Sequence, residues 1–148
     1  MAVKTYVGFK ADFPEDDGPE EGGRPGGKEL VDFVVDALRK GGFEPQDPSN
    51  REGWAWDFET RQGEFSNLSI LGHVGDEDRQ WLITNDCKLP FFKVLFGRKE
   101  AMESRNKFLN KFCNTIHEAF SADARFTLIK WYDEKTFDKL GDEPSDRP

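Results

Sequence analysis

Cysteine and histidine are scarce in this sequence, with only two of each among 148 residues. Two cysteines cannot build the dense disulfide framework of a small secreted domain, and unpaired thiols fit a reducing compartment. The first residues lack an apolar stretch followed by small residues, so we expect no signal peptide and a cytoplasmic location. The longest apolar runs cover only a few residues, whereas a membrane-spanning helix needs roughly 20, so we expect no membrane span.

Aromatic side chains, in contrast, make up 14% of the chain, with 14 Phe and 4 Trp. This supply of large apolar groups argues against disorder, and 148 residues suffice for one sizeable core but not for two. We therefore expect a single domain over residues 1–132, with an acidic flexible loop at 14–27. A frayed acidic tail is expected at 133–148.

Negative charge is concentrated in two segments of a chain with 29 acidic and 21 basic residues. Residues 12–25 hold six acids and one base, and residues 133–148 hold six acids and three bases. Residues 88–111 are basic, with seven bases and two acids. The net charge of −8 opposes direct binding to nucleic acid. The acidic segments either keep the protein in solution or attract a basic partner.

Hydrophobic periodicity predicts an α+β domain in the order β-α-β-β-β-α-β. Alternation from Val3 to Phe13 is typical of a half-buried strand, and apolar residues at three- and four-residue spacing predict helices at 28–40 and 98–121. A three-stranded meander is expected from Trp54 to Asp86. The last strand, Arg125–Tyr132, is apolar on both faces and is therefore expected at the centre of the sheet. This order favours a largely antiparallel sheet with two helices packed on one face.

One motif has the spacing of a phosphate-binding loop, because Gly22 to Lys28 satisfies G-x-x-x-x-G-K just before a predicted helix. A nucleotide-binding loop needs a Ser or Thr after the lysine to hold magnesium, and Glu29 stands there instead. The acids that precede the motif would repel a triphosphate. We therefore expect no nucleotide cofactor.

The histidines and cysteines offer only weak catalytic or metal-binding patterns. Cys113 and His117 are four residues apart on a predicted helix, a spacing that lets two side chains contact one metal ion. The sequence has no C-x-x-C, H-E-x-x-H or G-x-S-x-G motif. A hydrolase or metalloenzyme using His73, Cys87 and His117 would need these groups within roughly 4 Å of a common point. We expect no catalytic residue, no metal and no cofactor, and keep this enzyme as a third hypothesis.

Two apolar features allow both a functional and a structural interpretation. Trp54 and Trp56 share a strand face with Phe58 in the predicted meander, and together with Trp81 they could stack a small ligand. In the other interpretation they form the core beneath the helices. The connector from Leu89 to Gly97 carries five large apolar residues. It either plugs one end of the sheet or forms an exposed partner site.

These features favour a non-catalytic domain that binds a protein with a basic surface, in the manner of a bacterial immunity protein or antitoxin. The candidate partner-binding residues are the acids of the loop: Glu15, Asp16, Asp17, Glu20 and Glu21. The alternative is a small-molecule-binding domain that uses Trp54, Trp56 and Trp81. A homodimer in which acidic and basic segments meet would need no outside partner.

Overall fold

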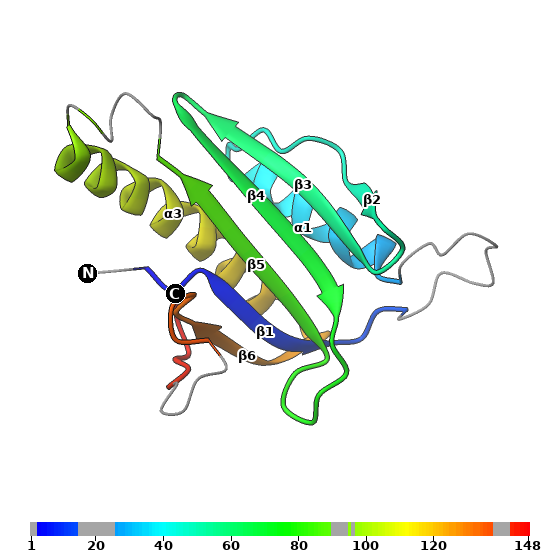
Figure 1. The fold of residues 1–148 in the computed structure, drawn as a ribbon. Coiled ribbons are helices and arrows are strands. Elements are labelled where there is room, and N and C mark those ends of the chain that lie inside the picture. The colour runs from blue at the N-terminus through cyan, green and yellow to red at the C-terminus, as the bar shows by residue number, and fades with distance from the viewer. Residues whose placement is uncertain (1–2, 15–25, 90–94, 96, 138–142) are drawn as a thin grey trace.

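A computed structural model describes residues 3–14, 26–89, 95, 97–137 and 143–148. These residues form a six-stranded sheet with two helices, in the chain order β-α-β-β-β-β-α-β (Figure 1). The strands are β1 (Tyr6–Ala11), β2 (Ser49–Arg51), β3 (Ala55–Gln62), β4 (Phe65–His73), β5 (Trp81–Lys88) and β6 (Phe126–Tyr132). The helices are α1 (Lys28–Lys40) and α3 (Arg98–Ser121). The predicted α+β class is confirmed.

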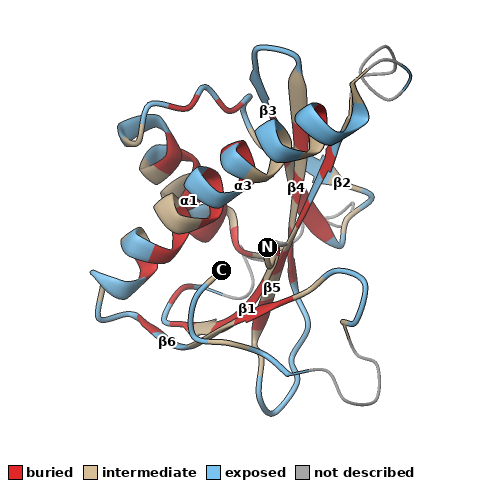
Figure 2. Cartoon of the chain, turned by 90° about the vertical axis from the view of Figure 1, so that its left-hand side faces the viewer, coloured by how far each residue is buried: buried red, intermediate tan, exposed pale blue. Residues whose placement is uncertain are grey.

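The strands are arranged in the order β2-β3-β4-β5-β1-β6, and every neighbouring pair is antiparallel. Figure 2 shows the sheet close to edge-on, with both helices on the same side. We call the helix-covered side the inner face and the opposite side the outer face. Figure 1 looks onto the outer face, with the helices behind the strands. The predicted antiparallel sheet with two helices on one face is thus confirmed.

Both helices begin and end at the predicted residues. Helix α1 buries a continuous apolar side, consisting of Leu30, Val31, Val34, Val35 and Leu38. It starts after Gly27, which has φ 92° and lies so close to Trp81 that a Cβ there would approach the indole to 2.7 Å. It ends at Gly41 and Gly42, where the amides of Gly42 and Phe43 donate to the carbonyls of Arg39 and Leu38. Within the described parts of the chain, no helix has the apolar length needed to cross a membrane.

Two strands differ from the prediction. Ser49–Arg51, expected within a connection, forms β2 and pairs with the start of β3. A three-residue strand is too short to show alternation, so the sequence pattern could not reveal it. Strand β6 lies at the edge of the sheet, not at its centre. It is apolar on both faces because Trp131 faces the core, while Tyr132 on the outer face is covered by Phe137, with ring centroids 5.2 Å apart.

The described residues of the C-terminal tail contact the sheet. Ser145 and Trp131 exchange two backbone hydrogen bonds of 2.8 and 2.9 Å along the outer edge of β6. Phe137 packs edge-on against Tyr6, and the guanidinium of Arg79 lies 4.8 Å above the Phe137 ring. The tail therefore covers the β1–β6 half of the outer face.

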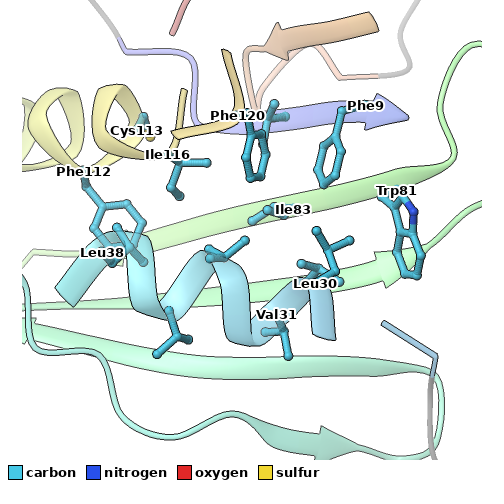
Figure 3. Close-up of a cluster of buried hydrophobic side chains, with 14 of the residues drawn as sticks. Phe9, Leu30, Val31, Leu38, Trp81, Ile83, Phe112, Cys113, Ile116 and Phe120 are labelled. Atoms are coloured by element: carbon cyan, nitrogen blue, oxygen red, sulfur yellow. The ribbon is translucent and has the colours of Figure 1, made fainter. Parts of the chain in front are cut away.

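The core lies between the inner face and the two helices (Figure 3). One part of it is a set of phenylalanines at the end of α3. The ring of Phe120 stacks on Phe126 at 4.1 Å and 13°, and lies 4.7 Å from Phe9. Phe120 and Phe9 are essentially inaccessible to solvent. This contact attaches the end of α3 to β1 and β6.

We predict that Phe120→Ala lowers the free energy of unfolding by about 3–5 kcal/mol, because it removes a buried ring and leaves a cavity among rigid neighbours. The measurement is urea unfolding followed by tryptophan fluorescence. Leu128→Ala is the control, because Leu128 is 54% exposed and its truncation should change stability by less than about 0.5 kcal/mol. Equal effects of the two substitutions would contradict this picture of the core.

Candidate functional site

The acidic residues proposed to bind a partner, Glu15, Asp16, Asp17, Glu20 and Glu21, lie outside the described residues. The same holds for most of the apolar connector at 89–97, of which Leu95 is described and is 61% exposed. The candidate site must therefore be built from other parts of the chain.

The three tryptophans proposed to bind a ligand do not form one accessible surface. Trp56 and Trp81 are 5% and 0% exposed and belong to the core on the inner face. Trp54 is 56% exposed and precedes the paired part of β3. Its ring lies 3.8 Å from where a Cβ of Gly72 would project on the outer face. The expected common face for Trp54 and Trp56 was therefore wrong, because the strand alternation begins only at Ala55.

His73, Cys87 and His117 do not converge. His73 pairs with Trp81 at one end of β5, and Cys87 lies six residues further along that strand, which corresponds to about 20 Å. His117 lies on α3, where its Nδ1 accepts a hydrogen bond of 3.1 Å from the indole of Trp131. Among the residues that the structure places, no three His, Cys, Asp or Glu side chains are grouped to hold a metal. The hydrolase or metalloenzyme hypothesis requires His73, Cys87 and His117 near a common point, and their positions do not meet that requirement.

The individual chemistry of these groups also fits structural roles. Burial raises the pKa of the Cys87 thiol to about 11 and raises that of Cys113 further. Burial and the cation of Arg147 lower the pKa of His117 and outweigh the opposing carboxylates of Glu118 and Asp146. The neutral imidazole is the form that accepts the Trp131 hydrogen bond. Lys28, from the phosphate-loop motif, is paired with Asp32 at 2.6 Å.

Strand β4 carries its side chains in an unusual arrangement. Asn67 and Ser69 point to the inner face and are fully buried, whereas Leu68 and Ile70 between them point to the outer face and are only partly buried. The buried polar groups are joined to Asn85 on β5, whose Oδ1 accepts hydrogen bonds from Ser69 (2.6 Å) and Asn67 (3.3 Å). The Asn85 amide donates to the Thr5 carbonyl at 2.9 Å.

The outer face of β3, β4 and β5 therefore has an apolar centre, and the described chain places no helix over it (Figures 1 and 2). We define the apolar strip as Leu68 and Ile70 of β4 with Leu82 of β5. Polar residues are usually exposed and large apolar residues are usually buried, so a buried polar group or an exposed apolar group is the informative observation. Strand β4 has both. The strip extends toward the exposed ring of Trp54 at one end.

Carboxylates flank the apolar strip in register. Leu68 is paired with Glu59 on one side and Asp86 on the other, and Ile70 is paired with Asp57. The Ser66 hydroxyl and the Arg61 guanidinium lower the pKa of Glu59, so this group is charged at neutral pH. Asp57 is paired with Arg51 at 3.0 Å. Asp86 is exposed and has no hydrogen bond or ion pair with any described residue.

Sequence reasoning missed this surface. The alternation of Asn67, Leu68, Ser69 and Ile70 was visible, but a period-2 pattern does not tell which side faces the helices. The available signal was the pair of polar residues Asn67 and Asn85 in strands that otherwise contribute apolar residues to the core.

Comparisons with protein-family models, with curated proteins and with solved structures give no match to this chain. The function of a relative therefore contributes nothing to the interpretation of the outer face.

We predict that Cys87 reacts slowly in the folded protein. With a pKa of about 11, roughly 0.1% of this thiol is ionised at pH 8, against about a quarter of a free cysteine. Labelling by iodoacetamide, followed by mass spectrometry, should be at least about a hundred-fold slower than in the urea-unfolded chain. Rapid labelling of Cys87 in the folded protein would return it to consideration as a nucleophile.

We also predict that acid weakens the fold through His117. Its pKa is lowered in the folded state below the ordinary value of 6.5, so the unfolded chain binds the proton more readily. The contribution to stability is therefore complete above pH 6.5 and is lost as pH falls below it. Urea unfolding between pH 8 and 5 should show this loss in the wild type and in the control His73→Gln. It should be smaller in His117→Gln, and equal slopes in all three would refute the assignment.

Proposed function

We propose that this chain is a non-catalytic protein-binding domain whose outer face, over β3 to β5, binds a partner with a basic surface. The observation that carries the proposal is the apolar strip flanked by carboxylates on the uncovered side of the sheet. Interface centres in proteins are apolar and their rims are polar, which is the arrangement found here.

The apolar strip supports binding because its side chains remain in contact with water. Leu68, Ile70 and Leu82 are partly exposed although the core is otherwise well covered. Removing apolar surface from water contributes about 25 cal/mol per Å². Trp54 adds a large exposed aromatic group near the end of the strip, and tryptophan is the residue type most enriched among those that dominate binding energies.

The flanking charges support a basic partner. Asp57, Glu59 and Asp86 lie on both sides of the strip, and Asp86 carries a charge that no described residue balances. A partner with lysines or arginines around an apolar ridge would complement this pattern. The chain's net charge of −8 would speed the approach of such a partner over a longer range.

The most concrete form of this proposal is a neutraliser of a basic target, as an immunity protein or antitoxin is. Such a protein needs a rigid surface and no chemistry of its own. The acids Glu15, Asp16, Asp17, Glu20 and Glu21 would then act at a distance and guide the target toward the strip. Reversing their charge should slow association, whereas substitutions in the strip should speed dissociation.

The test is affinity capture from the organism of origin at low and moderate salt, with wild type, Ile70→Glu and Leu128→Glu as baits. We predict that the wild type and Leu128→Glu retain the same basic protein. Ile70→Glu should retain at least ten-fold less of it, because the substitution places a charge in the centre of the interface. Leu128 is the control, since it is an apolar residue on a different strand and is more exposed than the partly buried Ile70.

Three results would count against the proposal. Equal capture by Ile70→Glu and the wild type, with circular dichroism showing that both are folded, would remove the strip from the interface. A captured protein whose binding does not weaken with salt would remove the charge argument. A dimer of the chain itself that Ile70→Glu dissociates would assign the strip to a second copy.

A further inference from the structure

A pocket of about 160 Å³ is lined in part by Asn85, the centre of the polar network between β4 and β5. Four parts of the chain meet there: the residues before β1, the end of β5, the first half of α3 and the residues after β6. This volume equals that of about five water molecules at roughly 30 Å³ each, so the pocket suits only a small organic molecule.

Arg105 is the cation that α3 contributes to the pocket wall. Its Nη1 donates a hydrogen bond of 3.4 Å to the carbonyl of Cys87, and its Nε is buried without any partner. No carboxylate lies within ion-pairing distance of Arg105 in the part of the chain that the structure describes. A buried guanidinium N–H without a partner is costly, and the planar guanidinium of arginine has the geometry to bind a carboxylate through two hydrogen bonds.

The floor beside Arg105 is rigid. Asn85 lines the pocket and is 1% exposed, and its side chain is held by Ser69, Asn67 and the Thr5 carbonyl. A site whose polar groups are held in place by other side chains loses little entropy when a ligand binds.

Negative charge lies at the mouth of the same pocket. Asp86 and Glu134 are exposed lining residues that make no hydrogen bond or ion pair with any described residue. Both lie near enough to Tyr6 to raise the pKa of its phenol, in addition to the larger effect of burial. Asp133, a third acid of the wall, accepts a hydrogen bond from the Lys135 amide.

We infer that this pocket binds a free α-amino acid with an apolar side chain, with the carboxylate on Arg105 and the ammonium group toward Asp86 and Glu134. The wall contributed by Met102 and Leu109 would contact the side chain. A simple anion fits less well, because the acids of the wall outnumber its cations. A simple cation would leave the Arg105 Nε without a partner.

The first experiment titrates L-leucine, N-acetyl-L-leucine and L-leucinamide into the full chain and follows ¹H–¹⁵N chemical shifts. Leucine should cause saturable shifts at Thr5, Asn85 and Arg105, and each blocked analogue should bind at least ten-fold more weakly. N-acetyl-L-leucine has no ammonium charge and L-leucinamide has no carboxylate. Equal binding of N-acetyl-L-leucine would identify an anion site and overturn the proposal, and so would the absence of saturable shifts with any apolar amino acid.

The second experiment assigns the contact to Arg105. Arg105→Lys keeps the positive charge but loses the planar pair of donors, so it should weaken leucine binding at least ten-fold while the protein stays folded. Arg98→Gln is the control, because Arg98 is an exposed cation on the same helix and should bind leucine as the wild type does. Unchanged affinity in Arg105→Lys, with a normal melting temperature, would overturn the assignment. Neither variant changes the apolar strip, so this result is separate from the partner-capture result.

Discussion

The hydrogen bonds among Asn67, Ser69 and Asn85 are the constraint on which both proposed surfaces depend. A shift of β4 by one residue would exchange its two faces. Leu68 and Ile70 would enter the core, which hydrophobicity alone would favour. The shift would also leave Asn85 buried beneath the helices without its hydrogen-bond partners. Each unpaired buried group would lower the stability of the fold by about 1–3 kcal/mol. The shift would equally remove Leu71 from its place between Trp56 and Ile83. The polar network therefore keeps the apolar strip on the outer face and holds the floor of the Arg105 pocket.

The two halves of the outer face differ in that the C-terminal tail covers only one of them. Phe137 packs on Tyr6 and Tyr132, and the stem of Arg79 lies so close to Gly8 that a Cβ there would approach it to 2.6 Å. The β1–β6 half is thus closed by the chain's own residues. The half formed by β3, β4 and β5 keeps partly exposed leucine and isoleucine side chains. A partner would meet an apolar centre with carboxylates beside it, bounded on one side by this covered region.

The groups that most often carry catalysis are used here to hold the fold together. His117 accepts a hydrogen bond from Trp131, and Cys113 is a fully buried core residue. Cys87 lies about 20 Å along β5 from the position paired with His73. Arg105, Asp86 and Glu134 lie together at the Arg105 pocket and are not used in this way among the described residues. The two binding proposals rest on this distribution.

The sequence by itself determined the α+β class and the bounds of both helices, because apolar residues at helical spacing and the flanking glycines are local signals. It also determined which residues of β1 reach the core, and which residues of β3 do so from Ala55 onward. Only the tertiary structure decided that β6 lies at the edge, since the side chains that cover it come from a tail with few apolar residues. Only the tertiary structure decided that β4 turns Leu68 and Ile70 outward and Asn67 and Ser69 inward. A polar residue within a strand carries no information about its partner in space, and Asn85 becomes the partner of Asn67 and Ser69 only when β4 and β5 pair.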